Sequence, residues 1–450
     1  MSRANKTNHG AAMPCPLIAC TGPDDFPPLL DKLKLRENPD QAVEHRVQQI
    51  LADVSDRGDE ALVDYTRRFD CPDFSPAMLA VPEDDIAEAM SRVPAEDLVI
   101  LTEAAHNIRV FHEAQKQRSW WQTGPDGQIL GQLVRPVDTV GLYVPGGQGG
   151  ETPLVSSLLM NAIPAQVAGV ERIVVVSPPR KDGSLNPYIL AAAGLLGLKE
   201  IYRVGSAWAV AALAHGTKAI PRVDVLAGPG NIYVTTAKRL LAGRVGIDMI
   251  AGPSEIVILA DGEANPAWMA ADMLSQAEHD RLASSVLITD SAKIGRAVLA
   301  ELERQLDLLP RNEIARKALA DWGAVIVASD LKAGVKLINK LAPEHLELAV
   351  ADPWALVGLV RHAGAIFMGR ACPEPVGDYF AGPNHVLPTL GTARFSSALS
   401  VDTFVKKSSL IAVGPEYTRK HAGKIARLAR LEGLEAHARS VECRNITKGD

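Results

Sequence analysis

The fold of this chain is decided by four short apolar runs, which read VGLYV at residues 140–144, IVVV at 173–176, IYRV at 201–204 and VDVL at 223–226. A helix-length stretch rich in Ala or Leu follows each of them. Strands that alternate with helices in this way are typical of βαβ units, whose parallel strands form one sheet. The pattern predicts a parallel α/β domain over residues 137–250.

A second series of β-rich runs predicts a second parallel sheet. The runs occupy residues 255–259, 285–289, 324–328, 346–350 and 365–368. The earlier segments 41–69 and 84–119 place apolar residues at helical spacing between charges, so we expect helices that pack on one side of a sheet. After residue 400 the pattern is helical and basic, and this tail is too small to fold alone.

These patterns divide the chain into four parts. Residues 1–40 are expected to form an N-terminal helical segment, and residues 41–136 together with 251–400 a discontinuous α/β domain. Residues 137–250 form the other α/β domain, and residues 401–450 a tail that docks on the main body or on a second subunit.

Composition favours a protein that acts on small molecules in the cytoplasm. The chain has 450 residues, of which 47% are hydrophobic and 22% charged, and its net charge of -6 argues against general affinity for nucleic acid. Five scattered cysteines without paired spacings fit reduced thiols. No apolar run has the length of a signal peptide core at the start or of a membrane span later, so we expect no membrane association.

A possible metal site begins with Gln276 and His279, whose i,i+3 spacing on a helix lets both converge on one ion. A complete zinc shell needs about four donors. The other plausible donors, Asp378 and His437, lie far downstream, so the fold would have to assemble the site. The alternative is that Gln276 and His279 simply end a solvated helix.

Acid-base chemistry is indicated by Glu344 beside His345, because a histidine titrates near neutral pH and a carboxylate can accept a proton from water. The alternative for this pair is a solvated surface turn. His385 follows in a second loop, where it could equally be a satisfied loop histidine. No nucleophile elbow is present, so covalent hydrolase chemistry has little support.

Three loops rich in Gly and Pro flank the predicted strands, at residues 146–150, 228–231 and 252–255. Loops of this kind in open α/β sheets collect ligands, and glycine lets backbone N–H groups approach a phosphate. None matches the G-x-G-x-x-G fingerprint or the P-loop, so motif alone leaves dinucleotide binding and plain turn chemistry open.

Taken together, these segments resemble the histidinol dehydrogenase family. The resemblance is carried by residues 141–147, 227–231, 247–255, 275–280, 341–347, 377–389 and 431–437, and it extends from about Asp24 to Arg444. It implies two Rossmann-like parallel-sheet domains of aldehyde-dehydrogenase-like type. It also implies oxidation of L-histidinol through the aldehyde to L-histidine, with two hydride transfers to NAD, in histidine biosynthesis.

The resemblance also assigns roles to individual residues. Zinc would be held by Gln276, His279, Asp378 and His437. Substrate would contact Ser254, Gln276, His279, His345, Asp378, His385, Glu432 and His437. His345 would accept the hydroxyl proton and Glu344 would activate the water that adds to the aldehyde. Family members are homodimers with a swapped C-terminal tail, so Glu432 and His437 would act in the partner subunit's site.

On the cofactor side the resemblance implies Tyr143 and Asn231, but the third position departs from the family pattern. Trp208 stands where relatives usually carry an amide near NAD. The indole either stacks on the nucleotide base or packs inside its Ala-rich helix and never meets the cofactor. The loop 148–155 is also a few residues longer than usual.

Two further alternatives remain from the sequence. The same scaffold could oxidise another small amino alcohol or polyol with zinc and NAD. The chain could also be a metal-dependent binding protein that has lost turnover, although the presence of both Glu344 and His345 argues against this.

Overall fold

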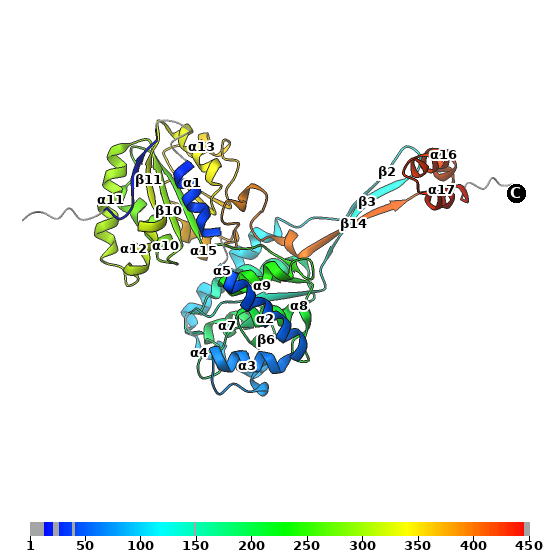
Figure 1. The fold of residues 1–450 in the computed structure, drawn as a ribbon, viewed down its shortest axis with the longest axis horizontal. Coiled ribbons are helices and arrows are strands. Elements are labelled where there is room, and N and C mark those ends of the chain that lie inside the picture. The colour runs from blue at the N-terminus through cyan, green and yellow to red at the C-terminus, as the bar shows by residue number, and fades with distance from the viewer. Residues whose placement is uncertain (1–12, 21–26, 38–40, 148–149, 445–450) are drawn as a thin grey trace, which may run out of the picture.

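The computed structural model describes residues 13–20, 27–37, 41–147 and 150–444. Two α/β lobes lie next to each other, and a narrow arm of strands extends from them and ends in two helices (Figure 1). Each lobe contains one fully parallel sheet, as the alternating runs predict, and the arm contains a small antiparallel sheet.

The five-stranded lobe contains the four runs of residues 140–226. In sheet order its strands are β6 (Glu200–Arg203), β5 (Arg172–Ser177), β4 (Thr139–Tyr143), β7 (Val225–Ala227) and β8 (Gly246–Ile247). The helices between them are α6 (Val155–Ala168), α7 (Pro187–Leu195), α8 (Ser206–His215) and α9 (Ile232–Leu241). Residues 207–214 of α8 are all buried, because their small or apolar side chains let the helix pack closely on every side.

The six-stranded lobe contains the second series of runs. Its strands are β1 (Leu17–Ala19), β11 (Ala324–Val327), β10 (Ser284–Thr289), β9 (Glu255–Ala260), β12 (His345–Ala349) and β13 (Ala365–Met368). Its longer helices are α10 (Pro266–Ala277), α11 (Ala292–Leu306), α12 (Asn312–Trp322) and α13 (Leu331–Leu341). The edge strand β1 departs from the helical segment expected over residues 1–40, in which α1 (Pro27–Lys34) is helical. Three residues are too few to show a period, and only pairing with β11 makes them a strand.

The helices of residues 41–113 pack on the five-stranded lobe. They are α2 (Gln41–Arg57), α3 (Asp59–Phe69), α4 (Glu83–Arg92) and α5 (Ala95–Glu113). The buried residues of α2 and α3 share a core with α8 and α9, and those of α4 and α5 share a core with α6 and α7. This arrangement differs from the expected grouping of residues 41–136 with 251–400. An apolar stripe shows that a helix has a buried face, but not which sheet covers it.

The arm is an antiparallel ribbon that the sequence did not lead us to expect. Its strands are β2 (Trp120–Thr123), β3 (Ile129–Pro136) and β14 (Val405–Ala412), with β3 in the middle. The helices α16 (Pro415–Leu431) and α17 (Glu435–Glu442) sit at its far end, away from both lobes (Figure 1). Asp126, in the β2–β3 turn, anchors them through a 2.8 Å contact with Nε2 of His421.

Apolar side chains are exposed along the arm and its terminal helices. Trp121, Ile411 and Leu431 are each more than half exposed. Exposed apolar residues that continue over one surface are typical of a surface that is covered by another protein chain. No described helix combines the length and the hydropathy that crossing a membrane requires.

Candidate active site

Glu344 and His345 lie where helix α13 is followed by strand β12. Ala342 ends α13 in the left-handed backbone conformation, with φ of 51°, and this turns the chain sharply into Pro343. His345 is the first residue of β12, and Glu255 is the first residue of the neighbouring strand β9. Both Glu344 and His345 are buried, so the alternative of a solvated surface turn is wrong.

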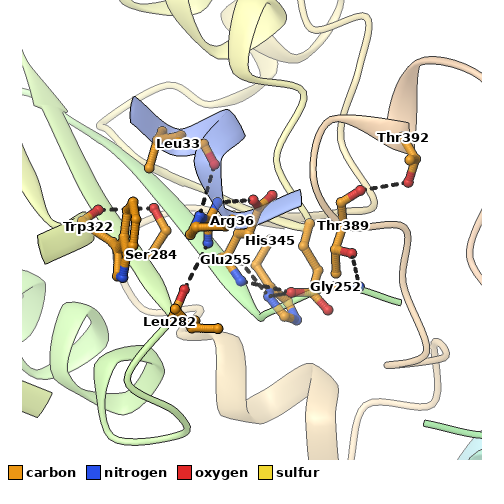
Figure 2. A network of polar contacts seen from close by, with 11 residues as sticks. Leu33, Arg36, Gly252, Glu255, Leu282, Ser284, Trp322, His345, Thr389 and Thr392 are labelled. Carbon is orange, nitrogen blue, oxygen red and sulfur yellow. Dashed lines mark hydrogen bonds and ion pairs between the residues drawn. The ribbon is translucent and has the colours of Figure 1, made fainter. Parts of the chain in front are cut away.

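One backbone hydrogen bond fixes the protonation of the His345 ring. Its Nδ1 lies 2.9 Å from the carbonyl oxygen of Glu255 (Figure 2), and a carbonyl can only accept a hydrogen bond. Nδ1 therefore carries the proton and Nε2 keeps its lone pair. Burial lowers the pKa of His345, which favours this neutral form near pH 7. Within the described part of the chain nothing hydrogen-bonds to Nε2, so this atom is available to a ligand.

The carboxylate of Glu344 is held by the other backbone group of the same residue. The N–H of Glu255 donates a 2.8 Å hydrogen bond to Oε2 of Glu344. Burial raises the pKa of Glu344 well above its ordinary value, and the negative charges of Glu255, Asp378 and Glu374 add to this rise. Such a carboxyl group exchanges its proton closer to neutral pH than an exposed one, as a general base or acid in an enzyme must.

Further acidic side chains surround the free nitrogen of His345. Nε2 lies 3.8 Å from Oε1 of Glu374 and 3.8 Å from Oδ1 of Asp378, both on α15 (Glu374–Tyr379). Burial first, and then the charge of Asp378, raises the pKa of Glu374 to about 9. On the same face of β12, Glu347 accepts a 2.7 Å hydrogen bond from the backbone N–H of Glu374. Neither Glu347 nor Glu374 is among the site residues predicted from the sequence.

The pattern of the sequence could have pointed to both missed residues. Glu347 follows His345 by two positions on a strand, which places the two side chains on one face of the sheet. Glu374 precedes Asp378 by four positions, which places both on one face of a helix. Neither spacing predicts that strand β12 and helix α15 lie against each other. Only the folded structure shows that they do.

Several predicted substrate and metal residues do meet at this site. The charges of Asp378, His279 and His385 all act on the pKa of His345, so the four side chains are neighbours. Gln276, near the end of α10, is only 1% exposed. Its Oε1 has no hydrogen-bond partner among the described residues, and a buried acceptor of this kind is ready to bind a cation or a donor. The alternative of a solvated helix end is therefore wrong for Gln276.

The donors offered by one chain fit a divalent metal ion. His345, Glu374 and Asp378 place their ligand atoms within 4.8 Å of one another. This group shares only Asp378 with the predicted zinc shell, and His279 is close enough for its charge to act on His345. An imidazole, carboxylates and a buried amide oxygen together suit zinc, and they leave negative charge for a cation to offset.

His437 and Glu432 are not part of this cluster within a single chain. Glu432 follows the last residue of α16 and His437 lies on α17, at the far end of the arm (Figure 1). Ser254 directly precedes Glu255, and its carbonyl oxygen accepts a 3.0 Å hydrogen bond from the N–H of Ser284.

The site faces the five-stranded lobe. The loop after α15 crosses to that lobe, where the side-chain amide of Asn384 donates a 2.5 Å hydrogen bond to the carbonyl oxygen of Met160 on α6. Next to it, His385 lies close to the backbone of Ser156, at the start of α6. Desolvation lowers the pKa of His385, and its Nε2 has no hydrogen-bond partner in the described ranges. A ligand between the lobes can thus reach both sides.

Two of the predicted cofactor residues lie at or beyond the carboxyl ends of strands in the five-stranded lobe. Tyr143, at the end of β4, is buried, and its hydroxyl accepts a 3.1 Å hydrogen bond from the N–H of Ser206. Asn231 caps helix α9, because its Oδ1 accepts hydrogen bonds from the N–H groups of Tyr233 and Val234. Carboxyl ends of parallel strands are where open α/β sheets bind ligands.

Gly228, between these two residues, explains why the loop after β7 needs glycine. Its φ of 122° is rarely adopted by other residues, and a Cβ there would lie 2.1 Å from the carbonyl oxygen of Tyr143. The loop therefore approaches β4 more closely than any side chain would allow.

Trp208 belongs to the core, and this corrects its assignment as a cofactor residue. It is 4% exposed, and its ring lies 5.6 Å from those of both Tyr65 and Phe69 on α3, at interplanar angles of 19° and 22°. An indole buried against two aromatic rings cannot also stack on a nucleotide base. The structure thus supports the packing alternative. The longer loop 148–155 includes residues 148–149, which lie outside the described residues.

Comparisons with known proteins point to a single family. Residues 33–445 match the family model described as histidinol dehydrogenase. A histidinol dehydrogenase of Nitratidesulfovibrio vulgaris is 64% identical over 433 residues, which cover 96% of this chain and 99% of the relative. That of Bacillus subtilis is 52% identical over 417 residues, which cover 92% of this chain and 96% of the relative. The crystal structure of histidinol dehydrogenase from Elizabethkingia anophelis matches with a TM-score of 0.88 at 36% identity, covering 96% of this chain and 98% of that one.

Proposed function

The chain belongs to the histidinol dehydrogenase family, and on that premise we propose that it oxidises L-histidinol to L-histidine through the aldehyde, with NAD accepting hydride twice. The observation that carries the proposal is the buried pair Glu344 and His345, held by both backbone groups of Glu255. This pair supplies the two proton transfers that the two oxidations need.

His345 acts in the first oxidation. Its Nε2 keeps a lone pair because Nδ1 donates to the carbonyl of Glu255. Nε2 accepts the proton of the substrate hydroxyl while hydride leaves the adjacent carbon, so the alcohol becomes an aldehyde. Asp378, whose Oδ1 lies 3.8 Å from Nε2, stabilises the imidazolium that forms.

Glu344 acts in the second oxidation. An aldehyde must first add water. Loss of hydride from the hydrate gives the carboxylic acid directly, whereas loss of hydride from the aldehyde itself would leave an acyl cation. Glu344 takes the proton of that water, and its raised pKa makes it a stronger base than an ordinary carboxylate. The N–H of Glu255 keeps the carboxylate aimed at the same place throughout.

A zinc ion would be held by Gln276, His279 and Asp378 together with a His437 supplied by a second copy of the chain. The orphaned Oε1 of Gln276 supports this assignment. A metal held there would act as a Lewis acid that fixes the orientation of the substrate. NAD would lie at the loops of Tyr143 and Asn231, on the lobe that faces the catalytic pair.

A homodimer explains why the tail lies away from the body. The arm carries Glu432 and His437 beyond both lobes of its own chain and exposes apolar residues along its length. A two-fold dimer in which each arm crosses to the other subunit covers these residues and brings both side chains to a site that contains His279 and Asp378.

Substrate profiling tests the proposed function. Purified protein with zinc and NAD is offered L-histidinol, L-histidinaldehyde and a panel of amino alcohols and polyols that lack imidazole, and NADH formation is followed. We expect turnover of both imidazole compounds and at least a hundredfold lower kcat/KM for the others. Equal turnover of the others would assign a different substrate, and zinc-dependent binding without any turnover would make the chain a binding protein.

A further inference from the structure

Arg36 and Glu255 form a buried ion pair directly behind the catalytic residues. Arg36 lies in a short 3-10 helix, residues Leu35–Glu37, that follows α1 (Pro27–Lys34), and its side chain is 2% exposed. One guanidinium nitrogen contacts Oε1 of Glu255, whose side chain is 10% exposed (Figure 2). Neither residue is among the site residues predicted from the sequence.

The guanidinium of Arg36 is fixed on every side. Its Nε donates a 3.3 Å hydrogen bond to the carbonyl of Leu33, and its Nη1 donates a 3.1 Å hydrogen bond to the carbonyl of Leu282 (Figure 2). Arginine presents its donors in a rigid planar fork, so these contacts define where the Glu255 carboxylate can lie. The N-terminal segment thereby holds one residue of the central strand β9 in place.

Glu255 links three segments around the catalytic pair. Its carboxylate pairs with Arg36 and lies close to the backbone of Leu390, in the loop that follows His385, and to the backbone of Glu344. Its N–H binds the carboxylate of Glu344, and its carbonyl binds Nδ1 of His345. Any shift of Glu255 therefore moves both catalytic groups together, and loss of its carbonyl contact frees the ring of His345 to change tautomer.

We infer that Arg36 and Glu255 are positioning residues for the reaction: the ion pair fixes the backbone that aims Glu344 and keeps Nε2 of His345 unprotonated. The inference rests on the proposed function of that pair. In the described part of the chain, Arg36 makes no hydrogen bond with Glu344 or His345, so it acts through Glu255, whose backbone holds both catalytic side chains.

The test compares Arg36→Met with a matched control, Arg203→Met. Arg203, in the other lobe, has the same kinds of partner as Arg36. Its buried guanidinium donates hydrogen bonds to the carbonyls of Met78 and Ala80 and to the carboxylate of Asp85. We expect Arg36→Met to lower kcat roughly tenfold to a hundredfold for both L-histidinol and L-histidinaldehyde. KM for L-histidinol and zinc content should change less than about twofold, because the ligands are untouched.

Two further variants sharpen the test. Arg36→Lys keeps the charge without the fork and should recover part of the lost kcat. The double variant Arg36→Met with Glu255→Gln removes both charges, so it should be less impaired than the product of the two single losses. The control Arg203→Met should lose thermal stability but keep kcat within about twofold of the parent protein, since ordinary surface and structural changes away from the site do not act on the chemical step.

Hydrogen exchange provides a readout that does not depend on turnover. The amide of Glu255 should exchange faster in Arg36→Met than in the parent protein, and it should be unchanged in Arg203→Met. The inference is overturned if Arg36→Met keeps kcat and amide exchange within twofold of the parent, or if its losses match those of Arg203→Met. If exchange responds as expected but the parent protein never oxidises L-histidinol, the proposed function fails and the positioning of Glu344 and His345 stands.

Discussion

The two α/β lobes share one architecture but bury different kinds of side chain. In the five-stranded lobe, helix α8 is a continuous buried run of apolar residues that includes Trp208. In the six-stranded lobe, the central strands begin with buried Glu255 and His345, and Glu347 follows on the same strand as His345. Both lobes have a parallel sheet, so the sheet alone does not account for the cluster of ionisable residues in one of them. The function resides in polar groups placed at the ends of one sheet.

The positions of the two sites in their sheets differ as well. Tyr143 lies at the carboxyl end of β4, the usual ligand-binding end of an open α/β sheet. Glu344 and His345 lie at the amino end of β12, where loops from α13 and α15 enclose them. The loop that follows α15 crosses the boundary of the lobes, where Asn384 bonds to Met160. Under the proposed function, substrate and cofactor would meet at this boundary.

The largest effect is expected at His345. Replacement by Asn keeps a polar group of similar size but removes the base, so kcat with L-histidinol should fall about 10²- to 10⁴-fold. Zinc content, NAD affinity and melting temperature serve as controls and should stay close to those of the parent protein. A variant that keeps more than a tenth of the parent kcat would place the base elsewhere.

The next effect concerns the other lobe and should touch stability alone. Trp208→Ala removes an indole that packs against Tyr65 and Phe69, and it should lower the free energy of unfolding by about 3–5 kcal/mol. The dissociation constant for NAD, measured by titration at a temperature where the variant is folded, should change little. A large loss of NAD affinity with an unchanged melting temperature would mean that Trp208 binds the cofactor.

A smaller effect, limited to one half of the reaction, is expected at Glu344. Glu344→Gln still accepts the hydrogen bond from Glu255 but cannot take a proton from water. Oxidation of the aldehyde should slow by about a hundredfold or more, while oxidation of the alcohol should slow by less than about tenfold. Single-turnover rates with L-histidinol and L-histidinaldehyde separate the two steps. Equal losses in both would mean that Glu344 does not act on the water alone.

The smallest effect is a change of stability with pH at Asp70, in the five-stranded lobe. Burial raises the pKa of Asp70 from 3.8 to about 6. Between these values the unfolded chain has lost the proton that the folded chain keeps, so the folded state loses stability as pH rises and the full penalty is present above about pH 6. Asp70→Asn should raise the melting temperature at pH 8 and by less at pH 4.5. An equal rise of the melting temperature at pH 8 and at pH 4.5 would contradict a cost of burying the ionised carboxylate of Asp70.

The sequence predicted both parallel sheets because their strands are buried on two faces. Such strands appear as short continuous runs of Val, Ile and Leu, and those of β5 and β10 were readable for that reason. The strands of the arm gave no such signal, because most of β14 is exposed and its side chains do not alternate between core and solvent. Hydrophobic periodicity in a sequence reflects which side chains are buried. A ribbon whose side chains are mostly exposed therefore cannot be predicted from it.

The site was predictable one residue at a time but not as a cluster. Glu344 and His345 stood out as neighbours in the sequence, and Gln276 and His279 as a helical pair. Glu374 could be linked to His345 only once α15 was seen to fold back over β12. The role of Arg36 was equally hidden, because its partner Glu255 lies 219 positions away.

The most direct test of the account is the stoichiometry of the complete reaction. A known amount of L-histidinol is converted with excess NAD and zinc, and NADH is measured by absorbance while L-histidine is measured by chromatography. If Glu344 and His345 serve both oxidations in one site, two NADH should form for each L-histidine, without release of aldehyde. One NADH for each L-histidinol, with aldehyde accumulating and no L-histidine, would contradict it.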